Sequence, residues 1–149
     1  MEFRAFQRYV ELVPLPAGAQ PRIQREVQNS DYESGVVLIG SERWRLRTAR
    51  ITPTKPGAFV AVWQRNSDGV TQPFGADDST SGLLVFVSEA ERFGVFRFTT
   101  SHLISLGVSQ SELHPGKRGF RVYPNWCSDL NRQASRTQDA QSSAFCELH

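Results

Sequence analysis

Short apolar runs separated by turns fill the middle of this 149-residue sequence, and they constrain its fold more than any other feature. The runs are rich in β-branched and aromatic residues, which favour strands, and glycine or proline interrupts them. None approaches the roughly 18 apolar residues of a membrane-spanning helix, so an integral membrane protein is excluded. The strand candidates are VVLIG (36–40), RWRLRTARI (43–51), AFVAVWQR (58–65), GLLVFVS (82–88), FGVFRFT (93–99) and KRGFRVY (117–123), the last strand of the chain.

The residues between these runs predict how the strands pair. The first two runs should form a hairpin that turns at Gly40–Ser41, and EAER (89–92) should join the runs at 82–88 and 93–99 into a second hairpin. ITPTKPG (51–57) interrupts the sheet, because neither proline nor glycine suits a central strand. The polar stretch 70–82 is predicted to be a loop.

Helix signals flank this strand region. Phe3, Phe6, Val10 and Val13 recur at helical spacing, and the proline-rich segment 14–21 ends that helix. Further along the chain we expect irregular or helical structure over 22–33, a short helix over 101–106, and the best helix candidate over 131–148. The sequence therefore predicts a single α+β domain, residues 1–149, whose mostly antiparallel sheet of five or six strands is flanked by N- and C-terminal helices.

Composition and cysteine usage narrow the class of protein further. The chain is 39% hydrophobic, which is too apolar for a disordered protein. Its N-terminus, MEFRAFQRYVELV, carries charges throughout and has no apolar secretory core, so we expect a cytoplasmic protein. Cys127 and Cys146 lack CxxC spacing and clustered histidines, so neither a zinc site nor another cofactor is predicted.

The positive charges are mostly arginines and fall in two blocks. Residues 41–65 hold six cations against one acid, and residues 117–136 hold five against one. Within the first block, Arg43, Arg45 and Arg47 alternate with apolar residues, so their guanidinium groups should share one face of a strand. The blocks indicate either a local anion-binding face or a solvated strand surface.

Motifs for catalysis are scarce in this sequence. There is no GxSxG nucleophile motif and no phosphate-binding GxxxxGK[ST] loop. Neither Lys55 nor Lys117 follows an acid at the spacing used by metal-dependent nucleases, although Asp31 and Glu33 lie just before the first strand. The sequence therefore predicts no catalytic residue and no metal site.

Two segments carry residues suited to binding an anion. In ITPTKPG, Thr52 and Thr54 offer hydroxyl groups, Lys55 supplies a point charge, and Gly57 permits close approach of the backbone.

In KRGFRVYPNW (117–126), strand alternation puts Arg121 and Tyr123 on one face and Phe120 and Val122 on the other. An arginine beside an exposed aromatic ring is a pairing that binds single-stranded nucleic acid. The alternative is that Tyr123 and Trp126 are structural aromatics.

The same two segments resemble the MepB family of small bacterial proteins. ARITPTKPGAFVAVWQRN (49–66) is similar to the family segment K-I-T-P-T-K-x-G-x-F-V-x-x-W-x-R-N, and GKRGFRVYPNW (116–126) to G-K-R-G-x-R-V-Y-P-x-W. ASRTQDAQSSAF (134–145) resembles the family helix A-x-x-T-Q-x-W-Q. Arg50 stands where the family usually has lysine, and Ala140 and Ala144 replace a tryptophan and a tyrosine.

The resemblance implies a fold like the restriction-endonuclease-like α/β core, together with nucleic-acid binding. The missing E-x-K spacing implies that a standard nuclease catalytic set is lost. Phe59 and Trp63 match the family and are expected in the core. The matched residues whose polar or charged side chains are suited to contact a ligand are Arg50, Thr52, Thr54, Lys55, Arg65, Lys117, Arg118, Arg121, Tyr123, Thr137 and Gln138.

The leading hypothesis is a cytoplasmic nucleic-acid-binding protein without catalytic activity. It would contact the phosphate backbone, with Tyr123 or Trp126 available to stack on the bases of a single strand. The first alternative is a divergent Mg²⁺-dependent nuclease or phosphodiesterase that uses Asp31, Glu33 and Lys55. The second is a module that binds a small ligand or a protein. The sequence does not predict an oligomeric state.

Overall fold

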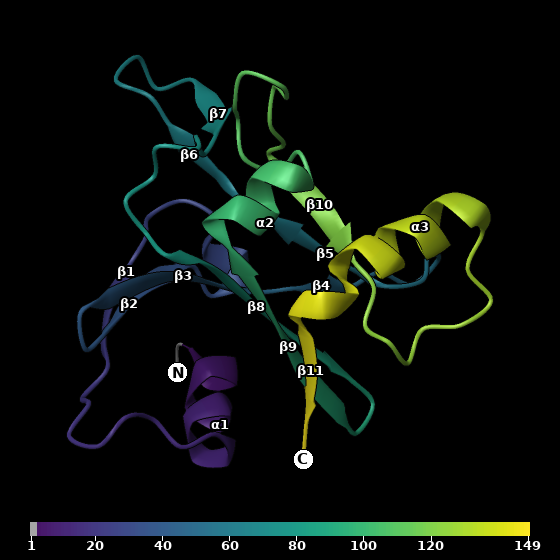
Figure 1. Cartoon of the computed structure of the whole chain (residues 1–149), viewed down its shortest axis with the longest axis horizontal. Helices are drawn as coiled ribbons and strands as arrows, with labels where there is room; N and C mark the ends of the chain where they lie inside the picture. The colour runs from purple at the N-terminus through teal and green to yellow at the C-terminus, as the bar shows by residue number, and fades with distance from the viewer. Residues whose placement is uncertain (1–2) are drawn as a thin grey trace.

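The computed structural model describes residues 3–149 as a mixed α+β fold built around one large sheet (Figure 1). This main sheet has the strand order β1-β2-β3-β8-β9-β11, and its neighbouring strands are antiparallel except for β3 and β8, which are parallel. Its strands are β1 (Arg22–Arg25), β2 (Gly35–Ile39), β3 (Glu42–Thr48), β8 (Gly82–Glu89), β9 (Arg92–Thr99) and β11 (Phe145–Leu148).

Two smaller sheets and the helices complete the fold. The small sheet contains β10 (Gly119–Val122), β5 (Ala58–Ala61) and β4 (Arg50–Ile51), and a separate hairpin contains β6 (Trp63–Arg65) and β7 (Thr71–Pro73). The α-helices are α1 (Arg4–Leu12), α2 (Thr100–Ser105) and α3 (Arg132–Gln141), and the 3-10 turns are η1 (Ser30–Tyr32) and η2 (Ser142–Ala144). None of the helices described between residues 3 and 149 has the length and apolar character to cross a lipid bilayer.

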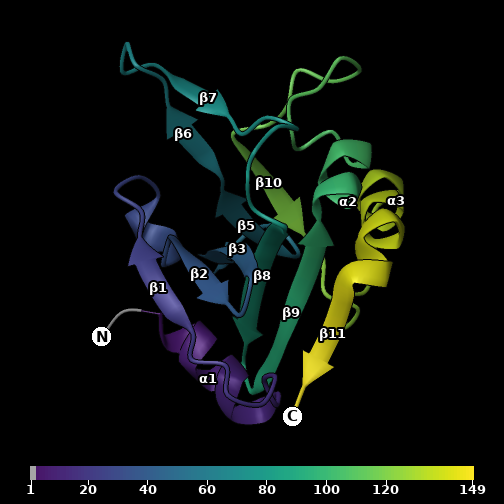
Figure 2. The ribbon, with the colours of Figure 1, turned by 60° about the vertical axis from the view of Figure 1, so that its left-hand side comes forward.

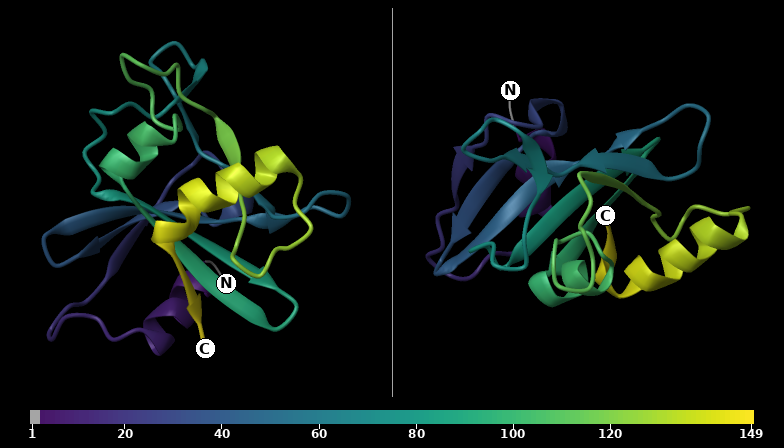
Figure 3. Two further views of the ribbon diagram at one scale, coloured as in Figure 1. Left: turned by 45° about the vertical axis from the view of Figure 1, so that its right-hand side comes forward. Right: turned by 90° about the horizontal axis from the view of Figure 1, so that it is seen from above.

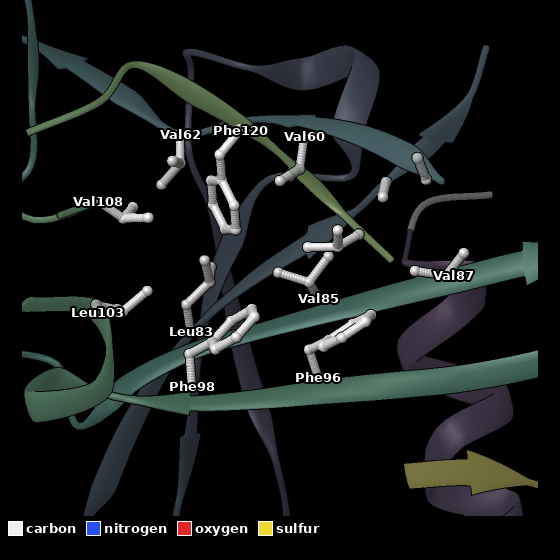
Figure 4. Close-up of a cluster of buried hydrophobic side chains, with 13 residues drawn as sticks. Val60, Val62, Leu83, Val85, Val87, Phe96, Phe98, Leu103, Val108 and Phe120 are labelled. Atoms are coloured by element: carbon white, nitrogen blue, oxygen red, sulfur yellow. The ribbon is translucent and has the colours of Figure 1, made fainter. Parts of the chain in front are cut away.

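The main sheet is buried on both faces because its central strands alternate between two cores. On β8, Leu83 and Val85 belong to the core shared with the small sheet (Figure 4), whereas Leu84 and Phe86 belong to the core beneath α1. Figure 2 shows α1 at the bottom of the view, with β5 and β10 above it. In Figure 3, α2 and α3 lie on the side of the long strands opposite α1. The small sheet therefore packs against one face of the main sheet, with a hydrophobic core between them.

The predicted hairpins and the α+β class are confirmed. β2 and β3 pair across a turn at Gly40, and β8 and β9 pair across Ala90 and Glu91. The main sheet has six strands, and the N-terminal helix and the short helix after β9 lie where the periodicity placed them. The part of the predicted N-terminal helix at residues 1 and 2 lies outside the described residues.

Three predictions about local structure are wrong. Segment 22–33 contains the edge strand β1 as well as η1, and segment 70–82 contains β7. The predicted helix over 131–148 ends at Gln141, and the chain finishes as β11, so KRGFRVY is not the last strand. These strands were missed because β1, β7 and β11 are held by backbone pairing and carry no clear apolar alternation.

The predicted strand over 58–65 is divided, with β5 and β6 separated at Val62. Val60 and Val62 point into the core, whereas Phe59 and Trp63 are only partly buried. The prediction that Phe59 and Trp63 belong to the core is therefore wrong. Period-two alternation explains the outcome, since valines and aromatic residues occupy opposite faces of this segment.

Glu33 closes the N-terminal end of α1 from outside the helix. The residue before the helix, Phe3, makes no side-chain cap, and the Glu33 carboxylate accepts hydrogen bonds from the backbone N–H groups of Arg4 (2.7 Å) and Ala5 (3.4 Å). Thr48 Oγ1 donates to the same carboxylate at 2.6 Å. A carboxylate at this end of a helix accepts hydrogen bonds from free N–H groups, and its negative charge interacts favourably with the positive end of the helix dipole.

Replacing Glu33 with alanine should lower the free energy of unfolding by about 1–2 kcal/mol, because two helix N–H groups and one hydroxyl lose their acceptor. Urea unfolding followed by circular dichroism measures this change. Glu11→Ala, at an exposed position of the same helix, is the control and should leave the midpoint in place. Equal midpoints for the two variants would contradict the capping role.

Candidate functional site

The loop 52–57 lies beside β10 and is held by Arg121. Arg121 Nη2 donates to Thr52 Oγ1 at 2.6 Å and to the carbonyl oxygen of Pro56 at 3.0 Å. Thr52 Oγ1 in turn donates to the carbonyl oxygen of Lys55 at 3.4 Å. Thr54 and Lys55 stay exposed at the tip of the loop. Arg121 therefore fixes the loop that presents the Lys55 ammonium group to solvent.

Gly57 makes the close contact between this loop and β10 possible. Its φ is +77°, a conformation that residues with a Cβ rarely adopt. A Cβ at this position would meet the carbonyl oxygen of Val122 at 2.6 Å and the ring of Tyr123 at 2.7 Å. Tyr123 thus packs against the backbone of the loop and is partly buried there.

A row of three side chains crosses the small sheet. Arg50 and Arg121 are each paired across the strands with Phe59, which lies between them. The Phe59 ring meets Tyr32 edge-on, with 6.4 Å between ring centroids. Arg50 is exposed, and its guanidinium lies 4.0 Å from the carboxylate of the exposed Asp31. Arg50 and Arg121 therefore flank Phe59 in the strand register of this sheet.

A second group of cations lies at the other end of β10, next to the β6–β7 hairpin. Arg65 is paired across that hairpin with Thr71, and Arg118 Nη1 donates to Thr71 Oγ1 at 3.4 Å. Arg65 also lies over the ring of Trp63, 5.0 Å from its centroid. Lys117 precedes Arg118, and both are exposed. The structure thus distributes the predicted cations to both ends of one short strand.

Gln138 and Thr137 lie apart from these cations. Gln138 Nε2 donates to the carbonyl oxygens of Pro124 (2.9 Å) and Cys127 (3.1 Å), and it ties α3 to the segment after β10. Thr137 Oγ1 donates to the carbonyl oxygen of Gln133 within its own helix. In this structure the amide of Gln138 serves to hold α3 in place.

Gln141 was not predicted to be a site residue, yet its side chain binds the backbone of β10 and of the residue that follows it. Its side chain is almost fully buried; Nε2 donates to the carbonyl oxygen of Arg121 at 2.8 Å, and Oε1 accepts from the Tyr123 N–H at 3.0 Å. The amide thus acts as a strand neighbour at the free edge of β10. The one signal available was its place in the family-like helix segment, three residues after Gln138.

Replacing Gln141 with leucine should lower the free energy of unfolding by about 2–3 kcal/mol, because a buried backbone donor and a buried acceptor lose their partners. Chemical denaturation measures the difference. Gln133→Leu, the same change at an exposed position of α3, is the control and should have little effect. A midpoint for Gln141→Leu that matches the control would show that β10 does not need this amide.

Trp126 is occupied by structural contacts. Its Nε1 donates to Glu89 at 2.9 Å, Arg92 lies 5.0 Å from its ring centroid, and Phe145 packs against it edge-on at 5.5 Å. The interpretation of Trp126 as a structural aromatic is therefore the one that fits. The hypothesis that it is free to stack on a base does not fit these contacts.

Two of the six cations in the first basic block, Arg45 and Arg47, lie inside the protein. Arg45 and Arg47 do share one face of β3, as the alternation predicted, but they are only 8% and 0% exposed. Glu26 bridges them, with Arg47 Nη1 2.6 Å from Glu26 Oε1 and Arg45 Nη1 bound to Oε2. Both interpretations of this block, an anion-binding face and a solvated surface, are wrong for these two residues.

Arg47 and Arg45 also bind partners other than Glu26. Arg47 Nε donates to the carbonyl oxygen of Ala61 at 3.0 Å and thereby joins the main sheet to the small sheet. Burial lowers the pKa of Arg47, and the neighbouring Glu26 carboxylate opposes that shift. Asp78 binds Arg45 at 2.8 Å. Burial raises the pKa of Asp78, but hydrogen bonds from Thr80 and the charge of Arg45 together hold it below its usual value.

The residues of the nuclease alternative are not gathered into one centre. Glu33 is engaged at the start of α1 and with Thr48, and Asp31 faces Arg50 on the surface. Within residues 3–149, no group of three or more histidine, cysteine or acidic side chains is arranged to hold a metal ion. Cys127 and Cys146 are free thiols.

Comparisons with known proteins identify the family. A family model described as MepB-like matches residues 26–147, most of the chain. A solved structure described as the crystal structure of MepB is 30% identical in sequence, covers 97% of this chain and 97% of its own, and has a TM-score of 0.84. A search of curated proteins finds no match. The resemblance carried by the two motifs is thereby confirmed, and the chain belongs to the MepB-like family.

Proposed function

We propose that this protein binds nucleic acid through the surface formed by the small sheet, the loop 52–57 and the β6–β7 hairpin, here called the motif surface. Its cations are Arg50, Lys55, Arg65, Lys117, Arg118 and Arg121, and its partly exposed aromatic residues are Phe59, Trp63 and Tyr123. The protein would hold the strand without cleaving it, in the cytoplasm.

The observation that carries the proposal is that, within residues 3–149, some cations of the protein are paired with carboxylates, whereas several cations of the motif surface are not. Arg45 and Arg47 are buried and paired with acids. By contrast, in the part of the chain that the structure describes, no carboxylate lies within 4.0 Å of Lys55, Lys117 or Arg121. Arg65 and Arg118 likewise contact only neutral oxygens there. Unpaired cations on one surface are what a phosphate backbone requires, because binding releases the counterions of the nucleic acid.

The aromatic residues favour a single strand over a duplex. Bases of a single strand stack on exposed rings, while neighbouring cations contact the phosphates. Phe59 lies between Arg50 and Arg121 in the strand register, and the Arg65 guanidinium lies over the ring of Trp63. A duplex, whose bases are already stacked, would use only the cations.

Fluorescence anisotropy with labelled single- and double-stranded oligonucleotides tests the proposal, at two salt concentrations and with Mg²⁺ present. We expect binding that weakens steeply as salt rises, tighter binding of the single strand, and intact oligonucleotide afterwards. A signal that rises and then decays would favour the nuclease alternative. Absence of binding even at low salt would overturn the proposal and leave the small-ligand or protein-binding alternative.

A further inference from the structure

An open groove lies between the segment Val27–Asn29 and the strand β6. Its volume is about 540 Å³, which is within the range of sites that hold small organic molecules. It is lined by Val27, Gln28, Asn29, Trp63, Gln64 and Arg65. Three of these come from the family-like segment 49–66, and the groove adjoins the cations at the β6–β7 end of the motif surface.

A buried amide at this groove has an unused donor. Asn29 is 8% exposed, and its Oδ1 accepts from Arg47 Nη2 (2.9 Å) and from the Trp63 N–H (3.1 Å). Both neighbours can only donate, so they fix which end of the amide is oxygen. Asn29 Nδ2 is left as a buried polar atom without a partner among the described residues. Unsatisfied buried donors are rare in folded proteins and call for an explanation.

The walls of the groove suit a flat, polar molecule next to a negative charge. The Trp63 ring is partly exposed, with the Arg65 guanidinium 5.0 Å from its centroid. Arg118 lies near Arg65. It donates a hydrogen bond to the hydroxyl group of Thr71, the residue paired with Arg65 across the hairpin. On the opposite wall Val27 is 94% exposed, an unusual position for a valine.

We propose that this groove holds one unstacked base of a bound single strand. The base would stack on Trp63 while its phosphates contact Arg65 and Arg118. Asn29 Nδ2 is buried in this structure, so a shift of the groove wall would be needed for it to donate to a carbonyl oxygen or ring nitrogen of the base. This inference rests on the proposed function and adds to it a specific base-binding position. It also predicts that duplex DNA, whose bases are stacked, makes no use of Trp63.

Intrinsic tryptophan fluorescence during titration with oligo(dT), run together with anisotropy, tests the groove. Oligo(dT) should quench the wild-type protein, and most of that quenching should disappear in Trp63→Phe, which keeps a ring for stacking and so keeps most of the affinity. Trp63→Leu, which has no ring, should bind oligo(dT) about 5–100-fold more weakly and bind duplex DNA normally. Trp126→Phe is the matched control and should retain the quenching.

The outcomes separate this inference from the proposal on which it rests. Binding by anisotropy with quenching that is equal in wild type and Trp63→Phe would overturn the base-binding groove and leave nucleic-acid binding intact. Absence of any binding would overturn both. If Trp63→Leu fails to fold, the quenching comparison between wild type and Trp63→Phe still decides the question.

Discussion

Replacing Glu26 with glutamine should lower the free energy of unfolding by about 3–5 kcal/mol, the largest stability change we expect from a single substitution. Glu26 is the carboxylate that binds both Arg45 and Arg47. Glutamine has nearly the same shape but no charge, so the two guanidinium groups would stay buried next to each other without it. Arg47, which is fully buried, would then have only neutral acceptors.

Urea unfolding followed by circular dichroism measures the effect of Glu26→Gln. Glu147→Gln is the matched control, because it removes the same type of charge from an exposed ion pair with Arg92 and should leave the midpoint almost unchanged. A double variant, Glu26→Gln with Arg47→Met, should lose less stability than the two single variants together, since it removes the buried charge as well as its partner. Strict additivity, or a Glu26→Gln midpoint equal to the control, would contradict this account.

The second large effect concerns binding. The triple variant Lys55→Gln, Lys117→Gln, Arg118→Gln should bind single-stranded DNA about 10²-fold more weakly near 0.1 M salt, if each cation contacts one phosphate. The slope of log affinity against log salt should also fall by about 2, because each phosphate contact contributes roughly 0.7 for a single strand. All three side chains are exposed, so the fold should be unaffected. Arg121 is left in place because it holds the loop 52–57.

A charge-matched control separates a specific surface from general attraction to DNA. Arg4, Arg8 and Arg22 are exposed cations on α1 and at the start of β1. Changing these three to glutamine removes the same net charge from elements that are not part of the motif surface. Anisotropy at four or more salt concentrations gives both slopes. If the two triple variants lose the same affinity, the motif surface is not the binding site.

The parts of the fold that were predictable are those in which side-chain pattern and backbone pairing agree. VVLIG and GLLVFVS both have strong apolar character, GLLVFVS forms a buried strand, and both hairpins are confirmed. β1 reads RIQR and lies at an edge, where polar side chains are tolerated, so its sequence has no strand signal. The chain leaves α3 at Gln141 because β11 pairs with β9, a contact that helical periodicity does not contain.

The site was predictable in composition but not in arrangement. The sequence did not predict that the two motifs are neighbours in space, and the structure brings them together because β10 pairs directly with β5. The sequence pattern could not show which arginines are buried and paired with an acid. Arg45 and Arg47 do not differ in sequence pattern from the other arginines, and their partner Glu26 belongs to a distant segment. The restriction-endonuclease-like core implied by the family resemblance stays a prediction.

The pairing of β5 with β10 also has a consequence for the order in which the protein assembles. Val60 lies opposite Phe120, about sixty residues later in the chain, whereas β8 and β9 are joined by a tight turn. Contacts between distant segments form late, because a long loop must close before they are made. During synthesis, β5 can pair with the preceding strand β4, but its other edge has no partner until β10, which ends at residue 122, has left the ribosome. The hairpins of the main sheet should therefore form first. The motif surface should fold last, and only then would it be able to bind.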